Sequence, residues 1–157
     1  MLFRSYPRGE AFDGLAQMRA PIKMGKSELL YRGSRVALLA VGSMVKTALA
    51  VREKLAEKGI YATLVNARFV KPIDEEMVTS LGHDHPLLVT MEENVASGGF
   101  GERVRDFSDD HRLPARVLPV TIPDEYVEHG NVELLKKEIG IDPDTIFDRI
   151  MKELTRE

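Results

Sequence analysis

Short apolar runs alternate with amphipathic segments along most of the chain. The first run, residues 36–41, is uninterrupted and ends at Gly42, which is typical of a strand covered on both faces. Further apolar runs predict strands over residues 61–67, 87–91 and 116–122. Between the first two strands, apolar side chains recur at steps of three and four residues from Ser43 to Gly59, so a helix joins them.

Further segments have the pattern of helices. Capping residues and stop signals place them at residues 75–81, from the turn at 98–101 to residue 111, at 132–139 and at 144–154. Because strands alternate with helices of about 10 to 15 residues, we expect right-handed crossovers and a mainly parallel sheet. The predicted fold class is therefore α/β: a three-layer, mainly parallel open sheet with helices on both faces.

The first 34 residues have a different pattern. Proline and glycine interrupt them at short intervals, and no helical period survives. We expect residues 1–34 to form an extended arm or interdomain linker, in which residues 27–31 are a candidate short strand. Residues 35–157 then form the α/β domain, and a chain of 157 residues is long enough for one such domain with a single substantial core.

Composition narrows the functional classes. Hydrophobic residues make up 43% and charged residues 30% of the chain, as in an ordinary globular protein. Lys and Arg total 22 against 25 Asp and Glu, and this net charge of −3 disfavours nucleic acid as a partner. The chain contains no cysteine, and no apolar run approaches the roughly 20 residues that span a bilayer. We expect a cytoplasmic protein without nucleic-acid or membrane partners.

Polar residues follow the strand predicted at residues 87–91. Glu92, Glu93 and Asn94 lie at its carboxyl end, the edge at which open α/β sheets bind ligands. Adjacent side chains of a strand point to opposite faces, so the two carboxylates do not form an obvious acid–base pair. We favour hydrogen bonding between domains or subunits over a solvated turn or a catalytic role. His129 follows the next strand at the same edge and is the histidine best placed to face a site or an interface.

A glycine-rich turn follows the same strand. Gly98, Gly99 and Gly101 open a helix, whose free N–H groups could bind a phosphate or a carboxylate. The spacing matches neither the G-x-G-x-x-G motif nor a P-loop. We therefore favour a tight turn or close packing against a partner over an anion site. On this interpretation, a valine in place of Gly99 weakens assembly and leaves the isolated domain folded.

Two further groups of side chains are weaker candidates. His83 and His85 flank Asp84 and could ligate a metal, but no third ligand stands at a familiar spacing, so a surface loop is favoured. Arg8 lies in a Pro/Gly turn, residues 6–9, that could present its guanidinium to a phosphate. For Arg8 the favoured alternative is a solvated side chain in the terminal segment. We predict no metal site in this chain.

Several short motifs, taken in order, resemble one family. They are Tyr-Pro-Arg-Gly at residues 6–9, Pro-Ile-Lys-Met-Gly-Lys at 21–26, the apolar run with its glycine at 36–42, Arg-Phe-Val-Lys-Pro-Ile-Asp at 68–74, Leu-Leu-Val-Thr-Met-Glu-Glu-Asn at 87–94, Gly-Gly-Phe-Gly at 98–101 and Ile-Pro-Asp-Glu-Tyr-Val-Glu-His-Gly at 122–130. Together they are spread over residues 6–130 of the chain. They resemble the C-terminal domain of 1-deoxy-D-xylulose-5-phosphate synthase, a thiamine-diphosphate enzyme of the transketolase superfamily.

The resemblance implies a transferase that decarboxylates pyruvate and joins the two-carbon unit to glyceraldehyde 3-phosphate, for isoprenoid, thiamine and pyridoxal synthesis. It implies thiamine diphosphate and magnesium as cofactors of the full-length enzyme. It also matches Arg8 with an arginine near the substrate phosphate, although Ser5 stands where the family usually has a further arginine. The implied partners are the upstream thiamine-diphosphate-binding domains of the same enzyme and, in a homodimer, a second copy.

The family's signature for diphosphate and magnesium, Gly-Asp-Gly followed by an Asn, does not occur in this chain. We therefore predict a fragment, or one piece of a split enzyme, that has no catalytic residue, binds no cofactor alone and is inactive by itself. Its expected role is to support domain packing and dimer assembly through residues 92–101 and His129. One alternative is a C-terminal piece of a split transketolase or of a 2-oxoacid dehydrogenase β-type subunit. Another is a free-standing anion-binding regulatory module that uses the Gly98 turn.

Overall fold

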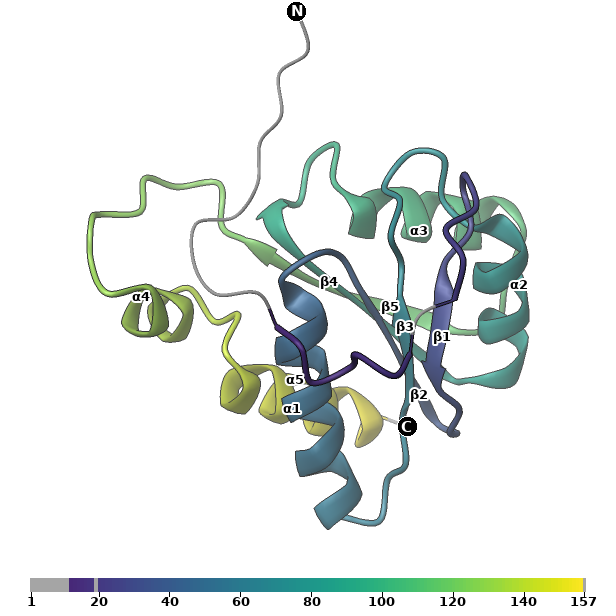
Figure 1. Ribbon diagram of the computed structural model, residues 1–157, viewed down its shortest axis with the longest axis horizontal. Coiled ribbons are helices and arrows are strands. Elements are labelled where there is room, and N and C mark those ends of the chain that lie inside the picture. Colours follow the sequence, from purple (N-terminus) through teal and green to yellow (C-terminus); the bar gives the residue numbers. More distant parts are fainter. Residues whose placement is uncertain (1–11, 19, 157) are drawn as a thin grey trace, which may run out of the picture.

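A five-stranded sheet forms the centre of the computed structural model, which describes residues 12–18 and 20–156 (Figure 1). Its strands are β1 (Glu28–Tyr31), β2 (Val36–Ala40), β3 (Thr63–Asn66), β4 (Leu87–Val95) and β5 (Arg116–Ile122). They lie in the order β1-β3-β2-β4-β5. Strands β2 to β5 run parallel, and β1 pairs antiparallel with β3 at one edge. The prediction of a mainly parallel open sheet is confirmed.

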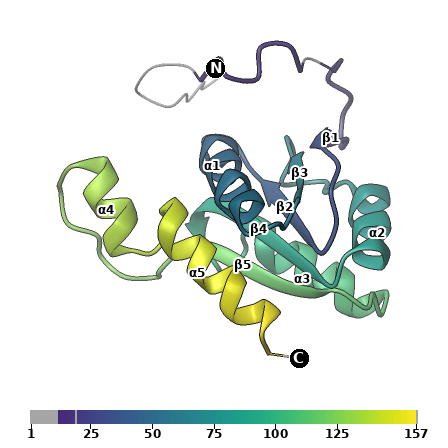
Figure 2. The ribbon, with the colours of Figure 1, turned by 90° about the horizontal axis from the view of Figure 1, so that it is seen from below.

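Helices cover both faces of this sheet. They are α1 (Met44–Glu57), α2 (Glu75–Asp84), α3 (Phe100–Asp110), α4 (Val132–Glu138) and α5 (Pro143–Leu154). Helices α1 and α5 pack on one face and α2 and α3 on the other, which makes three layers (Figures 1 and 2). No helix in the described part of the chain is long and apolar enough to cross a membrane.

Alternate residues of the strands contribute to two apolar cores. Leu38 of β2 packs in the core beneath α1 and α5, together with Leu55 and Ile146. The next residue, Leu39, packs in the core beneath α2 and α3, together with Phe100. Leu38 and Leu39 are 0% and 2% exposed, which confirms that the uninterrupted apolar run is a strand covered on both faces.

Three element boundaries differ from the prediction by two residues or more. They are the start of β3, at Thr63 rather than residue 61, the end of α2, at Asp84 rather than 81, and the end of β4, at Val95 rather than 91. Helix α2 gains its last turn because the backbone N–H of His85 donates to the carbonyl of Leu81 at 2.9 Å. Strand β4 is longer because it pairs again with β5 after a break in register that follows Met91.

The candidate strand at residues 27–31 is present as β1, the antiparallel edge of the sheet. Two buried acids hold the chain at the start of β1 against the carboxyl ends of the parallel strands. The Glu28 carboxylate pairs with Arg68 at 2.6 Å. Asp74, which caps α2 as predicted, accepts both the N–H and the hydroxyl of Ser27 at 2.8 Å. The division into an arm and a separate domain remains a prediction.

Candidate functional site at the carboxyl edge of the sheet

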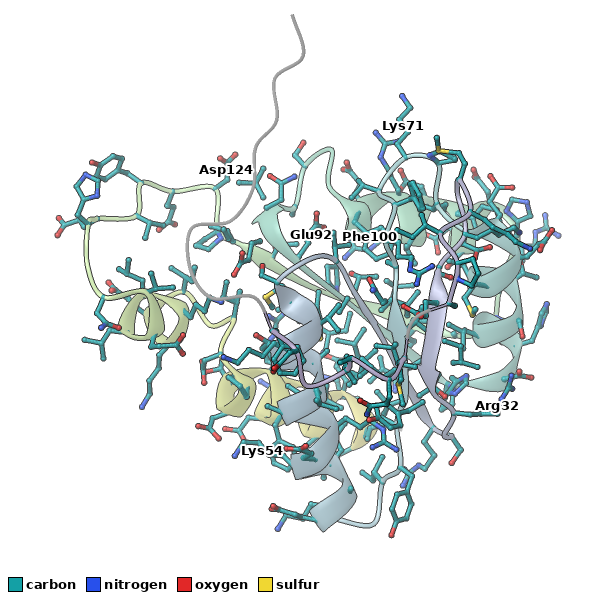
Figure 3. The ribbon with its side chains drawn as sticks, viewed as in Figure 1. Arg32, Lys54, Lys71, Glu92, Phe100 and Asp124 are labelled. Carbon is teal, nitrogen blue, oxygen red and sulfur yellow. The ribbon has the colours of Figure 1, made fainter. Side chains whose placement is uncertain are left out.

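The loops that follow the parallel strands lie along one edge of the sheet. Figure 3 shows Lys71, Glu92 and Asp124 along this edge, after β3, in β4 and after β5. Arg32 and Lys54 lie near the opposite edge in the same view. Ligands of open α/β sheets bind outside the carboxyl ends of the strands, so the edge with Glu92 is the candidate site.

The carboxylate of Glu92 is turned into the protein. The residue is 3% exposed. Its Oε2 accepts the N–H of Phe100 at 2.8 Å, and its Oε1 accepts the N–H of Gly101 at 2.7 Å. These are the first two N–H groups of α3, which have no partner inside the helix. Glu92 was predicted to contact another domain or subunit; in this structure its carboxylate is instead buried against α3 of the same domain.

The same contact bears on whether the glycine turn at residues 98–101 can bind an external anion. A helix N-terminus binds an anion through free N–H groups. Here the N–H groups of Phe100 and Gly101 already have the Glu92 carboxylate, and the N–H of Gly98 donates to Glu102 at 2.5 Å. The protein's own carboxylates thus occupy the position of an external anion. The alternative of a regulatory module that uses the Gly98 turn loses the donors on which it depended.

Close packing explains the glycines of this turn. Gly98 has a φ of 73°, a conformation that L side chains rarely adopt. A Cβ at Gly99 would lie 2.7 Å from both the Glu92 carboxylate and the Val95 carbonyl, and a Cβ at Gly101 would lie 2.6 Å from the hydroxyl of Thr90. Gly99 and Gly101 therefore make room inside the domain. A Cβ at Gly99 would collide with backbone, so we expect Gly99→Val to destabilise the isolated domain as well as to weaken assembly.

Glu93 points to the other side of β4, as the alternation of side chains predicts. Its Oε1 lies 2.8 Å from the Nζ of Lys136 in α4, and its Oε2 accepts the hydroxyl of Ser43, just before α1, at 2.5 Å. Burial raises the pKa of Glu93, but the bonds from Lys136 and Ser43 outweigh burial and hold the pKa below its ordinary value. Because α4 has no buried residue, the pair with Lys136 is a main attachment of this helix.

The remaining candidates at this edge are exposed. Asn94 and Gly98 lie on the surface of the turn between β4 and α3, and His129 lies on the surface of the segment between β5 and α4. Figure 1 shows that segment leading away from the sheet edge toward α4. Within the described residues, no hydrogen bond joins His129 to Glu92.

Arg8, the candidate for binding a substrate phosphate, lies outside the described residues. His83 is exposed on α2, whereas His85 is only 5% exposed. The His85 ring contacts the hydroxyl of Thr63 at 2.8 Å and the carbonyl of Leu81 at 3.1 Å. A surface loop is therefore the wrong interpretation for His85. Residues 12–18 and 20–156 contain no group of three or more His, Asp or Glu side chains that could hold a metal ion.

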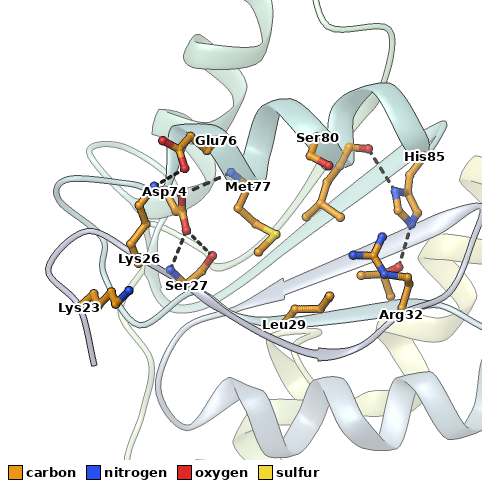
Figure 4. Close-up of a pocket in the computed structure, with 12 residues that line it drawn as sticks. Lys23, Lys26, Ser27, Leu29, Arg32, Asp74, Glu76, Met77, Ser80 and His85 are labelled. Atoms are coloured by element: carbon orange, nitrogen blue, oxygen red, sulfur yellow. Dashed lines mark hydrogen bonds and ion pairs between the residues drawn. The ribbon is translucent and has the colours of Figure 1, made fainter. Parts of the chain in front are cut away.

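The structure also contains a cleft that the sequence did not predict. A cleft of about 490 Å³ lies between β1 and α2 (Figure 4). It is lined by Lys23, Lys26, Ser27, Leu29, Arg32, Thr63, Asp74, Glu76, Met77, Ser80, Leu81 and His85. These residues come from three stretches of the sequence, residues 23–32, Thr63 and residues 74–85, in which local signals predicted the strand at 27–31 and the Asp74 cap. The cleft could not be predicted because it exists only once β1 pairs with β3.

Comparisons with known proteins agree on one family. Residues 25–146 match the family model described as transketolase, C-terminal domain. The 1-deoxy-D-xylulose-5-phosphate synthase of Lachnoclostridium phytofermentans is 47% identical over 149 residues, which are 94% of this chain and 24% of that protein. The synthase of Acaryochloris marina is 40% identical over 149 residues, 93% of this chain and 23% of that protein. The chain spans about a quarter of the length of these curated relatives.

Solved structures show the same fold. A split gene transketolase, described as an inactive β4 tetramer, is similar with a TM-score of 0.78 and 27% identity, over 87% of this chain and 43% of that chain. A transketolase from Pichia stipitis is similar with a TM-score of 0.60 and 18% identity, over 82% of this chain and 18% of that chain. At this lower identity the second likeness concerns the fold alone.

Glu92→Gln tests whether the buried carboxylate holds the start of α3. The glutamine carbonyl accepts one N–H, and its NH2 group leaves the other buried donor unpaired. We therefore expect the free energy of unfolding, measured with urea, to fall by about 1–3 kcal/mol. The matched control is Glu125→Gln, which is exposed and should change the value by at most about 0.5 kcal/mol. Equal unfolding free energies for the wild type and E92Q would contradict this role.

Glu93→Gln tests the attachment of α4 through its pH dependence. A pKa lowered in the folded state stabilises the protein above the ordinary value of 4.5 and ceases to do so as the pH falls through the folded pKa. We expect E93Q to be less stable than the wild type at neutral pH by less than about 1 kcal/mol, since the pair is partly exposed. This difference should shrink once the pH falls below 4.5. Urea unfolding at several pH values measures it, and a difference that grows in acid would refute the assignment.

Proposed function

We propose, from the premise that this chain belongs to the transketolase C-terminal domain family, that it forms the C-terminal part of a 1-deoxy-D-xylulose-5-phosphate synthase. The observation that carries the proposal is the 47% identity to such a synthase over 94% of this chain. The match covers 24% of the relative, so the remaining three quarters or so of the enzyme are the first proposed partner. The assembled enzyme would convert pyruvate and glyceraldehyde 3-phosphate into 1-deoxyxylulose 5-phosphate and CO2.

The described residues do not fit the cofactors of this reaction. Thiamine diphosphate and magnesium require free donors for the diphosphate and oxygen ligands for the metal. The N–H groups at the start of α3 are already bonded to Glu92. The described ranges also lack a cluster of three acids or histidines for a metal. We assign the chemistry to the rest of the enzyme and expect this chain alone to be inactive.

The proposed contribution of this chain is to pack against the rest of the enzyme and to support a homodimer. Tyr126, Val132 and Leu134 are apolar side chains that are 85%, 62% and 70% exposed, spread along the chain from the segment after β5 into α4, and are here together called the α4 patch. They follow β5 at the carboxyl edge, and Figures 1 and 2 agree that α4 stands away from the sheet. Such exposed apolar side chains favour a surface that another domain covers. The exposed Glu93, Asn94, Gly98 and His129 would lie around this contact, and Gly99 and Gly101 would shape it from within.

A second candidate is a separate subunit of a split transketolase. The likeness to the split gene transketolase, with a TM-score of 0.78, favours it. The two candidates differ in the product of the assembled enzyme. A synthase releases CO2 from pyruvate, whereas a transketolase moves a two-carbon unit from a ketose phosphate to an aldose phosphate.

Complementation tests the proposal. The first sample is the chain alone. The second is the chain mixed with the Lachnoclostridium synthase from which the matching quarter has been removed. Both are assayed with thiamine diphosphate, magnesium, pyruvate and glyceraldehyde 3-phosphate. We expect 1-deoxyxylulose 5-phosphate from the mixture and from neither part alone. Activity of the chain alone would contradict the proposal. So would an inactive mixture in which both parts are folded and associated.

Tyr126→Asp tests the α4 patch within the same assay. A charge in a covered apolar contact should weaken association with the truncated synthase at least about tenfold. Tyr61→Asp is the matched control, because Tyr61 is 62% exposed before β3, at the opposite edge of the sheet. Association is measured by titrating the chain into the truncated synthase. Equal losses for the two variants would show that the α4 patch is not the contact.

A further inference from the structure

The cleft between β1 and α2 has the size and walls of a small-molecule site. Its volume of about 490 Å³ lies within the range of about 300–1,000 Å³ that such sites occupy. Leu29 of β1 and Met77 and Leu81 of α2 supply an apolar lining. Figure 4 shows Leu29 and Met77 between Lys23 at one end and Arg32 at the other. The cleft therefore combines an apolar middle with cationic ends.

The charges of the cleft leave a net cation available. Lys26 is engaged, because its Nζ lies 2.6 Å from Glu76 and 3.4 Å from Asp74. Lys23 and Arg32 have no ion-pair partner among residues 12–18 and 20–156. Because Asp74 and Glu76 are already paired with Lys26, the charges of Lys23 and Arg32 make the cleft attract a negatively charged ligand.

In the wall beside Arg32, the side chains of His85 and Thr63 are bonded to each other and to the backbone. The Leu81 carbonyl can only accept, so the His85 ring donates to it through Nδ1 at 3.1 Å. In the neutral ring Nε2 then accepts the hydroxyl of Thr63, whose oxygen in turn accepts the N–H of Gly33 at 2.9 Å. His85 and Thr63 are 5% and 1% exposed. Within this wall the Arg32 guanidinium is the group with donors to offer.

We propose that this cleft binds a small amphipathic organic anion, a carbon chain of a few atoms with one phosphate or carboxylate group. Arg32 holds the anionic group, because a guanidinium presents several donors in the geometry of such a group. Leu29, Met77 and Leu81 cover the carbon chain. The site lies apart from the α4 patch, on the face of the sheet that α2 covers. It does not depend on the reaction proposed for the assembled enzyme.

Hexyl phosphate is the probe that tests this site. It is titrated into the 157-residue chain and followed through backbone amide signals by NMR, beside hexanol and inorganic phosphate. We expect saturable shifts at Leu29, Arg32 and Met77 with hexyl phosphate, and affinities at least about tenfold weaker for hexanol and for phosphate. If hexanol bound as tightly as hexyl phosphate, the proposed role of the anionic group would be wrong. If phosphate bound as tightly, the proposed role of the apolar lining would be wrong. Shifts confined to the α4 patch, or none, would overturn the site.

Arg32→Gln and a matched variant locate the anionic group. Arg32 is exposed and makes no ion pair within the described residues, so R32Q should keep the unfolding midpoint of the wild type. Its affinity for hexyl phosphate should fall about tenfold. Arg105→Gln removes an equally exposed charge from α3, outside the cleft, and should leave the affinity unchanged. Unchanged affinity in R32Q, or an equal loss in R105Q, would refute the assignment of Arg32.

Discussion

The buried carboxylate of Glu92 accepts the two N–H groups with which α3 begins, and the carboxyl edge of the sheet is built around this contact. The contact needs close approach, which is why Gly99 and Gly101 have no room for a side chain. It also places Glu93 on the opposite side of β4, where it binds Lys136 of α4. The carboxyl edge of such a sheet commonly binds ligands. In this protein, a carboxylate of the domain itself accepts the N–H groups of Phe100 and Gly101 at this edge.

This arrangement separates packing from chemistry in the proposed enzyme. The donors that could hold a diphosphate are bonded inside the domain, whereas apolar side chains such as Leu134 are left exposed beside the same edge. On the proposed function, the domain would contribute surface to the assembly and the reacting groups would come from elsewhere in it. The cleft at β1 is a different feature, since its walls combine an apolar lining with Lys23 and Arg32, which have no ion-pair partner within the described residues. Packing and ligand binding would then use different parts of one small domain.

Local signals predicted most of the fold, and long-range contacts account for what was missed. The apolar run of β2 and the capping side chains of Asp74 and Asp142 act within a few residues, so the elements they predict are present. The burial of His85 depends on Thr63, 22 residues earlier, and no local pattern indicates this. The inward turn of Glu92 was equally unpredictable, because alternation along a strand says that two neighbours diverge and not which one is buried.

Calorimetric titration of this chain alone with thiamine diphosphate and Mg²⁺ tests the central claim, that the domain carries packing surfaces and leaves the cofactor to its partners. We expect no saturable heat at cofactor concentrations up to about a millimolar, because a site whose binding free energy is weaker than about 4 kcal/mol stays unfilled in this range. Saturable heat with one cofactor bound per chain, and amide shifts of Phe100 and Gly101 in a parallel NMR titration, would contradict this expectation. In that case the Glu92 contact would have to open for a ligand.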